Sequence, residues 1–211
     1  MGTLLLVRHG QASFGAQDYD QLSEHGRQQA AVVGAALAAR EVTPARIVTG
    51  SLRRQRDTTD LAARAAGWAA GPEVDPRWDE FSSAGTPGEA AVVRQRDETV
   101  RTFATRFDSA IDRWFAGEQD WAEPFKAFMD RVVSGLEAVR PGSGETHVVF
   151  TSSGAIAAVA AHLLGAPEIW PRLNRVTVNC GVTTVVSGRR GLSLVAFNDH
   201  GHLAPEAVTY R

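Results

Sequence analysis

The chain opens with an uninterrupted run of large aliphatic side chains, Leu4 to Val7, which leads directly into Arg8, His9 and Gly10. A strand that is apolar at every position, rather than at alternate positions, is typical of a parallel sheet buried on both faces. Ligands of such α/β sheets bind beyond the carboxyl ends of the strands. The pattern therefore predicts that Arg8 and His9 lie at a ligand-binding edge of the sheet. The alternative is that His9 only makes local hydrogen bonds at the end of the strand.

Helical and strand patterns alternate along most of the remaining sequence. We expect helices over residues 23–39, 52–66, 89–116, 124–139 and 154–164, and further strands over residues 46–49, 147–151, 176–186 and 194–197. A strand–helix–strand–helix order favours a right-handed parallel unit. The short connection 187–191 predicts a hairpin, which makes one of the last two strands antiparallel. The fold class predicted is α/β, with a mostly parallel central sheet, one antiparallel strand and helices on both faces.

Residues 82–145 show no strand pattern. We interpret them as a helical insertion within a single domain of residues 1–211, and we expect this insertion to form a lid over the active-site edge. Its Arg94, Arg96 and Arg101 could meet further anionic groups of a ligand. Solvated arginines on an amphipathic helix are the favoured interpretation for most of them.

Composition narrows the possible partners. The 211 residues are 44% hydrophobic and 22% charged, which is ordinary for a globular protein, and the net charge of −2 favours neither nucleic acid nor an anionic membrane as partner. The single cysteine, Cys180, excludes an intrachain disulfide. No apolar run reaches the roughly 18–20 residues of a membrane span, and no leader pattern precedes the first strand, so we expect a cytoplasmic protein.

Polar clusters follow four of the predicted strands. In order they are Arg8, His9 and Gln11; Ser51 with Arg53, Arg54 and Arg56; Ser152 and Ser153; and Asn198, Asp199, His200 and His202. If these strands are parallel, all four clusters meet at one edge of the sheet. The third cluster also begins a helix, where free amides and the helix dipole favour a phosphate.

The arginine-rich second cluster has two interpretations. Most charge runs of this kind form a solvated helix face, and Arg53 and Arg56 fit that pattern. Arg54 shares a helical face with Thr58 and Leu61, so we expect it to point inward.

Two further groups of side chains are candidates for chemistry. Glu80 is a loop carboxylate by position, but it lies between Trp78 and Phe81, and apolar surroundings favour the protonated carboxyl that a general acid requires. His200 and His202 could bind zinc. Because no third and fourth ligand follows at metal-site spacing, zinc is the less favoured interpretation.

Taken together, these motifs resemble the histidine phosphatase superfamily, the phosphoglycerate-mutase-like proteins. The resemblance rests on Leu-Val-Arg-His-Gly-Gln at residues 6–11, Leu-Ser-Glu-His-Gly-Arg-Gln-Gln-Ala at 22–30, Gly-Ser-Leu-Arg-Arg-Gln-Arg-Asp-Thr at 50–58, Trp-Asp-Glu-Phe at 78–81 and Asn-Asp-His-Gly-His-Leu at 198–203. It implies that His9 is the phosphorylated nucleophile, that Arg8 and Arg54 clamp the phosphoryl oxygens, and that Glu80 protonates the leaving oxygen. It also implies that no metal or organic cofactor is needed and that the ligand is a small phosphorylated substrate or inorganic phosphate. We expect Gln11, Ser152, Ser153 and His200 to bind the substrate.

The chain departs from this family pattern in two places. Ser152 stands where the family usually has a second histidine, and Gly15 stands where it frequently has an asparagine. Loss of one donor to a transferring group typically costs on the order of 10²–10³ in rate. Ser152 can donate a hydrogen bond but supplies no positive charge. One hypothesis is that His200 reaches the vacant position from a neighbouring strand.

Three functions therefore stay open from the sequence. The first is a phosphomonoester phosphatase acting through phosphorylated His9, which retention of the other catalytic residues favours. The second is a catalytically impaired member that binds a phosphorylated ligand or partner, which Ser152 favours. The third is a mutase, for which a site lacking one phosphoryl ligand is less suited.

Overall fold

The computed structural model describes residues 1–13, 20–82, 98–118 and 121–210. The chain divides into two compact units, one formed by Met1–Glu80 together with Val132–Arg211 and the other by Phe81–Arg131. All of the residues that carry the site belong to the first unit.

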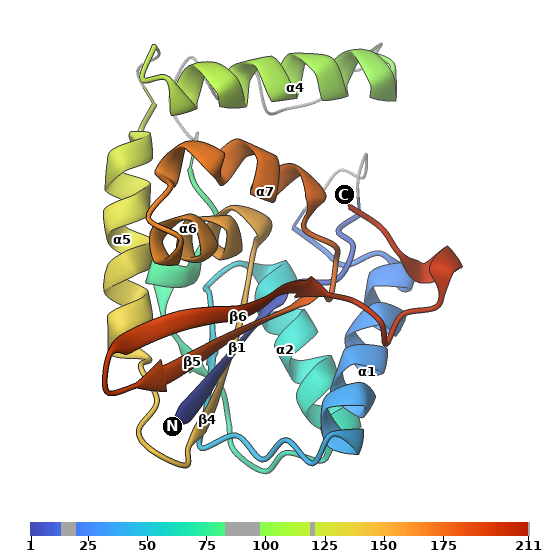
Figure 1. Cartoon of the computed structure of the whole chain (residues 1–211). Helices are drawn as coiled ribbons and strands as arrows, with labels where there is room; N and C mark the ends of the chain where they lie inside the picture. The colour runs from blue at the N-terminus through green and yellow to red at the C-terminus, as the bar shows by residue number, and fades with distance from the viewer. Residues whose placement is uncertain (14–19, 83–97, 119–120, 211) are drawn as a thin grey trace. The chain divides into compact units, whose positions relative to one another are not determined.

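The first unit is built on a six-stranded mixed sheet (Figure 1). The strand order is β3 (Glu73–Val74), β2 (Arg46–Thr49), β4 (Thr146–Thr151), β1 (Gly2–Arg8), β5 (Val182–Gly188) and β6 (Gly191–Asp199). Strands β1 to β4 are parallel, whereas β5 is antiparallel to both of its neighbours, so β6 again runs in the direction of β1. The predicted fold class, with a single antiparallel strand, is confirmed.

Helices cover both faces of this sheet (Figure 1). Leu5 and Val7 of β1 join the core cluster of α1 (Glu24–Ala39) and α2 (Arg53–Ala66), which includes Val33 and Ala62. Alternate residues of a strand point to opposite faces. The intervening Leu4 and Leu6 are also fully buried, on the face that α6 (Ser153–Leu163) covers, so β1 is apolar throughout because both of its faces are covered.

Two helix ends agree with the signals in the sequence. Ser23 is the N-cap of α1, because its side chain accepts a hydrogen bond from the amide of Gly26. Gly67 ends α2 in the left-handed conformation, with φ of 69°. The predicted strand 46–49 also coincides with β2. At these three places the local sequence alone was sufficient to predict where an element begins or ends.

The predicted strand over residues 176–186 is wrong in its first part. Residues Trp170–Val176 form helix α7, and β5 begins only at Val182. The intervening turn has Cys180 in the left-handed region, with φ of 58°, and its amides pair with Arg8 and with Thr209 near the end of the chain. Contacts so distant in sequence override the local apolar pattern. The last strand, β6, is longer than the predicted 194–197, and the two-residue β3 was not predicted.

The second unit contains α4 (Val100–Phe115) and the first half of α5 (Phe125–Ala138). Its described residues pack around an aromatic cluster made of Phe81, Trp114, Trp121, Phe125 and Phe128. No strand occurs among its described residues, as the sequence predicts.

Some of the predictions for the insertion reach beyond this description. Arg94, Arg96 and the first part of the predicted helix 89–116 lie outside the described residues, and Arg101 lies in α4. That the insertion forms a lid stays a prediction.

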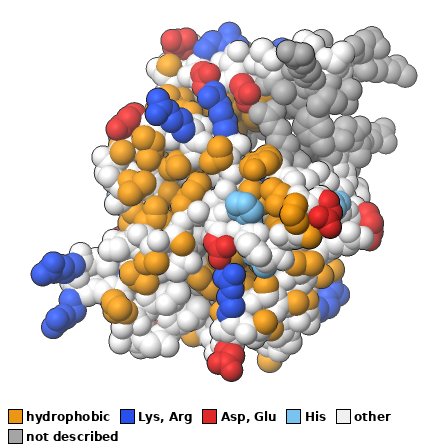
Figure 2. Space-filling model, turned by 45° about the vertical axis from the view of Figure 1, so that its right-hand side comes forward, with side chains coloured by type: hydrophobic (Ala, Val, Ile, Leu, Met, Phe, Trp, Pro, Cys, Tyr) orange, Lys and Arg blue, Asp and Glu red, His pale blue; other side chains and the backbone are white. Residues whose placement is uncertain are grey.

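Two surface properties bear on the predicted partners. No helix in the described part of the chain is long and apolar enough to cross a membrane. On the face shown in Figure 2, basic and acidic side chains are interspersed among apolar ones and do not gather into a continuous basic surface.

Candidate active site

The site forms where β1 and β4 end side by side. Arg8 is paired in register with Thr151, so His9 and Ser152 follow as neighbours at the carboxyl edge of the sheet. The His9 amide donates to the Thr151 carbonyl at 2.8 Å, and the Asn179 side chain donates to the His9 carbonyl at 3.0 Å. The backbone of His9 is therefore held from both adjacent strand ends.

The turn after His9 depends on the absence of a side chain at Gly10. A Cβ at Gly10 would lie 2.3 Å from the carbonyl oxygen of Gly26 in the first turn of α1. The Gly10 amide donates to Thr58 Oγ1 of α2 at 3.0 Å. These contacts seat the turn between two helices and leave little freedom in the direction of the His9 side chain.

The imidazole of His9 is presented in one tautomer. Nδ1 lies 2.7 Å from the Gly10 carbonyl oxygen, which can only accept, so Nδ1 carries the proton. Nε2 is then the unprotonated nitrogen, and it accepts from Nε of Arg54 at 3.2 Å. Burial, together with the positive charges of Arg54 and Arg8, holds the pKa of His9 well below its usual value of 6.5. The ring is therefore neutral, with its nucleophilic lone pair facing a guanidinium.

Two buried arginines place their positive charges near this ring. Arg54 is 8% exposed, and its Nη1 pairs with Asp20 Oδ1 at 2.7 Å. Arg8 is 6% exposed, and its Nη1 donates to the carbonyls of Tyr210, at 2.7 Å, and Thr177. These tethers hold two fixed positive charges near the buried side chain of His9.

The neighbouring arginines of α2 behave as expected. Arg53 and Arg56 are both exposed, and Arg53 pairs with Asp57 one helical turn away at 3.6 Å. The prediction that Arg54 alone of the three points inward is confirmed.

Glu80 lies at the amino terminus of α6. Its Oε2 accepts from the amide of Gly154 at 3.2 Å and from the hydroxyl of Ser153 at 3.4 Å. The close approach requires glycine, because a Cβ at Gly154 would lie 2.2 Å from Glu80 Oε1. The expectation of apolar surroundings is corrected here: Trp78 is fully buried, but the carboxylate itself contacts polar groups.

Ser152 is fully buried beside His9, and its Oγ accepts from Nε2 of Gln55 at 2.9 Å. His200 does not meet it. The end of β6 is three strand spacings from β4, or about 14 Å at ~4.8 Å per strand. The His200 ring bonds instead to the Asn198 carbonyl through Nδ1 at 2.7 Å. The sheet order thus gives no support to the hypothesis that His200 fills the position of the missing histidine.

Gln11, the remaining predicted binding residue, follows the His9 turn and lies against the N-cap of α1. Its side-chain oxygen accepts from the hydroxyl of Ser23 at 2.9 Å, and its amide donates to Gln29 at 2.8 Å. The structure therefore joins Gln11 to the helix cap beside the His9 turn.

Several supporting residues of the site were not predicted from the sequence. Asp20 orients Arg54, Asn179 fixes the His9 backbone, Gln29 holds both the Gln11 amide and the C-terminal segment, and Gln55 contacts Ser152. Gln55 is adjacent to Arg54 in sequence and is wholly buried, so a polar residue on the inward side of α2 was the available signal.

Metal binding is the alternative interpretation of His200 and His202. Among the residues that the structure describes, no group of three or more histidine, cysteine, aspartate or glutamate side chains could hold a metal ion. His202 bonds to the Cys180 carbonyl at 3.1 Å, as His200 does to Asn198, so both rings contact the local backbone.

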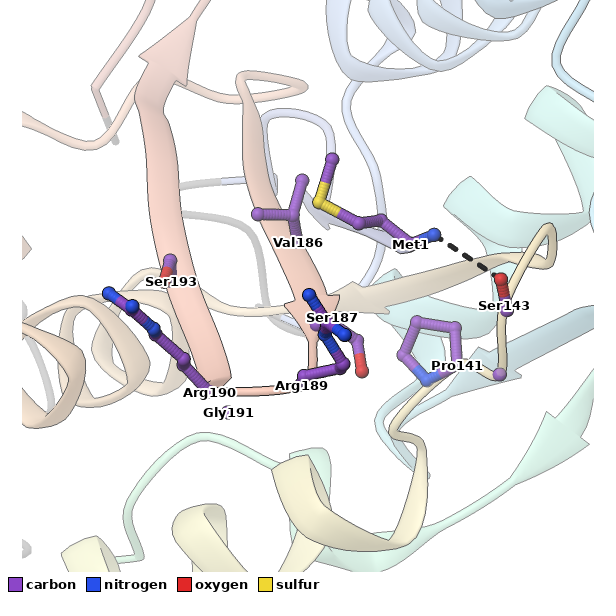
Figure 3. Close-up of a pocket in the computed structure, with 11 residues that line it drawn as sticks. Met1, Pro141, Ser143, Val186, Ser187, Arg189, Arg190, Gly191 and Ser193 are labelled. Atoms are coloured by element: carbon purple, nitrogen blue, oxygen red, sulfur yellow. Dashed lines mark hydrogen bonds between the residues drawn. The ribbon is translucent and has the colours of Figure 1, made fainter.

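A separate open pocket lies at the opposite end of β1, next to the hairpin that joins β5 and β6 (Figure 3). Met1, Pro141 and Ser187 are among the residues that line it, and the amino terminus donates to Ser143 Oγ at 3.3 Å. Because it is separated from His9 by the length of β1, it takes no part in the chemistry of the site.

The lowered pKa of His9 predicts a pH dependence of stability. Below pH 6.5 the unfolded chain protonates this histidine while the folded chain does not, so the unfolded state binds more protons. The free energy of unfolding should therefore decrease as the pH falls from 7 to 5.5, by at most about 1.4 kcal/mol per pH unit for this group. Urea denaturation of the wild type and His9→Asn at both pH values checks this. Equal pH dependence in the two proteins would contradict it.

Comparison with known proteins agrees with this geometry. The family model of the histidine phosphatase superfamily (branch 1) matches residues 4–200, and the chain belongs to that superfamily. Among curated protein sequences no match was found.

Solved structures show the same fold. A mycobacterial glucosyl-3-phosphoglycerate phosphatase in complex with VO3 is 24% identical, with 94% of this chain and 99% of that chain covered and a TM-score of 0.67. YhfR of Bacillus stearothermophilus is 21% identical, with 96% and 99% covered and a TM-score of 0.72. A phosphoserine phosphatase mutant from Entamoeba histolytica in complex with phosphoserine is 19% identical, with 97% and 100% covered and a TM-score of 0.69.

Proposed function

We propose that this protein is a metal-independent phosphatase that hydrolyses a small phosphomonoester through a phosphohistidine intermediate on His9. Membership of the superfamily supports a phosphatase or phosphotransferase, and two of the structural neighbours are named as phosphatases. The observation that carries the proposal is the neutral imidazole of His9, with Nδ1 bonded to the Gly10 carbonyl and Nε2 facing Arg54.

In the first half-reaction the phosphate group binds between Arg8, Arg54 and the start of α6. The planar guanidinium groups each offer several donors to phosphoryl oxygens. The Arg54 donor leaves His9 Nε2 for a phosphoryl oxygen, and the freed lone pair attacks phosphorus. As the N–P bond forms, the bond from phosphorus to the ester oxygen breaks, and protonated Glu80 transfers its proton to that oxygen.

In the second half-reaction water attacks the phosphorus of the phosphohistidine. The Glu80 carboxylate takes one proton of this water, the N–P bond breaks, and its electrons return to Nε2 of His9. Inorganic phosphate then leaves, with both groups in their original protonation states. Covalent catalysis accelerates the reaction because it replaces one difficult displacement with two easier ones. Positioning of the phosphoryl group and stabilisation of its charge supply most of the remaining rate acceleration.

The remaining site residues take binding roles in this proposal. Ser152 donates its hydroxyl proton to the phosphate at the α6 amino terminus, and the Ser153 hydroxyl turns from Glu80 Oε2 to the phosphate when substrate binds. Gln11 contacts the substrate from beside the N-cap of α1. We also propose that residues 82–145 act as a lid that selects the substrate, and that the enzyme acts in the cytoplasm.

A catalytically impaired protein that binds a phosphorylated ligand is the second candidate. The observation that favours it is Ser152, which provides no positive charge at the position of the second histidine. A mutase ranks third, because it must retain the phosphoryl group away from water. Hydrolysis of p-nitrophenyl phosphate in the presence of EDTA distinguishes the phosphatase from the impaired binding protein. Turnover supports the phosphatase, and phosphate binding without turnover supports the binding protein.

The role of Glu80 predicts a dependence on the leaving group. Glu80→Gln removes the transferable proton while it keeps the acceptor for the Gly154 amide. We expect kcat/KM, which reports the step that cleaves the ester and not the later attack of water, to fall by about 10²–10⁴-fold for an alkyl phosphate, whose leaving oxygen needs protonation. For p-nitrophenyl phosphate we expect kcat/KM to fall by much less. Steady-state kinetics with both esters measures this difference. Equal losses for the two would show that Glu80 is not the general acid.

A further inference from the structure

Gln55 makes an unusual set of buried contacts. Its side chain is fully buried, and its Nε2 donates to Ser152 Oγ at 2.9 Å and to the Trp78 carbonyl at 3.0 Å. Its Oε1 accepts from the amide of Leu52, just before α2, at 3.2 Å. Both amide protons and the amide oxygen are thus in use, and the side chain has one allowed orientation.

This arrangement determines the direction of the Ser152 hydroxyl. Because Gln55 donates to it, the Ser152 oxygen is an acceptor in that bond, and its own proton must go elsewhere. Ser152 is the N-cap residue of α6 but its side chain caps no amide there. Among the residues that the structure describes, no acceptor for this proton is found, although the side chain is fully buried.

The position of Ser152 supplies an acceptor when substrate is bound. Ser152 follows Thr151 at the end of β4, directly beside His9 at the end of β1. A phosphoryl group on or approaching Nε2 of His9 places anionic oxygens at this edge of the sheet. A hydroxyl whose oxygen is already engaged by an amide donates to such an oxygen without having to reorganise.

The second proton of Gln55 connects the same network to Glu80. The Trp78 carbonyl accepts from Gln55 and also from Thr151 Oγ1, and Trp78 ends the short helix η1 (Pro76–Trp78) two residues before Glu80. Gln55 thereby links α2, the β4–α6 turn and the segment that carries the general acid.

We propose that Gln55 is a positioning residue: it orients the Ser152 hydroxyl as a hydrogen-bond donor to the phosphoryl group and so partly replaces the histidine that is absent at position 152. The proposal rests on the proposed function for its effect on turnover. Its effect on the affinity for a phosphate-like anion is independent of turnover.

The test is a double-mutant cycle of Ser152→Ala and Gln55→Met. Met has nearly the length of Gln and fills its space, but it cannot donate to the Ser152 oxygen. We expect each single variant to lower kcat/KM by about 10²-fold at most, and the double variant to lose little more than either, because both remove the same donor. The affinity for orthovanadate, measured by competition or calorimetry, should follow the same non-additive pattern.

A third variant separates orientation from packing. In Gln55→Glu the introduced carboxylate can only accept, so the Ser152 proton turns toward it and away from the phosphoryl group. The expected loss of orthovanadate affinity is at least that of Ser152→Ala, because the new negative charge also repels the anion. Arg56→Gln, at an exposed position of the same helix, is the matched control, and thermal unfolding identifies any variant that fails to fold.

The outcomes distinguish the two proposals. Non-additive losses of orthovanadate affinity support the role of Gln55 whether or not the wild type turns over. Additive losses of orthovanadate affinity would overturn it. So would wild-type orthovanadate affinity in Gln55→Met when Ser152→Ala binds orthovanadate more weakly. Absence of wild-type turnover with any phosphomonoester would count against the phosphatase and leave the affinity cycle as the test of Gln55.

Discussion

Replacement of His9 by alanine is expected to abolish hydrolysis of aryl phosphates, with a loss of kcat of at least about 10⁴-fold. The reason is that no other described side chain at this edge combines a neutral imidazole, a tautomer set by a backbone carbonyl and a facing guanidinium. The measurement is the rate of p-nitrophenol release in buffer that contains EDTA.

A matched control makes this result specific. His162 lies on α6 and is exposed, so His162→Ala removes an imidazole from the same unit without touching the site. We expect that variant to keep wild-type activity. Residual activity of His9→Ala within tenfold of the wild type would contradict a nucleophilic role for His9.

Arg54→Lys is expected to have the second largest effect. Lysine keeps the positive charge but loses the planar fork that contacts His9 and Asp20 and that would meet the phosphoryl oxygens. We predict a loss of kcat/KM of about 10²–10³-fold. Arg53→Lys is the matched control. Because Arg53 is exposed, this substitution should have no measurable effect on kcat/KM.

Removal of the Arg54 charge has a further consequence for pH dependence. Its charge is one cause of the lowered pKa of His9, second to burial. In Arg54→Met the pKa of His9 should therefore rise toward its usual value, and the residual kcat/KM should begin to fall at a higher pH as the solution is acidified. An acid limb that does not move between Arg54→Met and wild type would show that Arg54 does not act on His9.

The position of His9 and the inward direction of Arg54 could be predicted from the sequence because their signals are local. The apolar run before Arg8 and His9 identifies a strand end, and the face that Arg54 shares with Thr58 identifies its direction. Each of these inferences needs only the period of a strand or a helix, and the structure agrees with both.

The contacts that orient these groups could not be predicted in the same way. Asn179 reaches His9 across 170 positions of sequence, and Gln55 reaches Ser152 across 97. A buried glutamine and a solvated one look alike in a helical pattern rich in polar residues. The sheet order likewise bears on His200, because the sequence predicted neither which of the last two strands is antiparallel nor how far the strand of His200 lies from β4.

The turn after α7 shows the same limit in the fold. The apolar pattern over 176–186 favoured a continuous strand, but the backbone of 179 and 180 pairs with the C-terminal segment and with the end of β1. These pairings place Asn179 under His9. The wrong start of the predicted strand and the failure to predict the role of Asn179 therefore have the same cause. Both depend on contacts that form only when the chain is folded.

The central claim is that a phosphoryl group passes through His9. The most direct test is to mix the wild-type protein with a rapidly cleaved aryl phosphate, quench within the first turnover under alkaline conditions, and locate the modification by mass spectrometry. We predict an alkali-stable, acid-labile phosphoryl group on the peptide that contains His9, and none in His9→Ala. Full turnover by the wild type with no phosphorylated His9 at any quench time would contradict it.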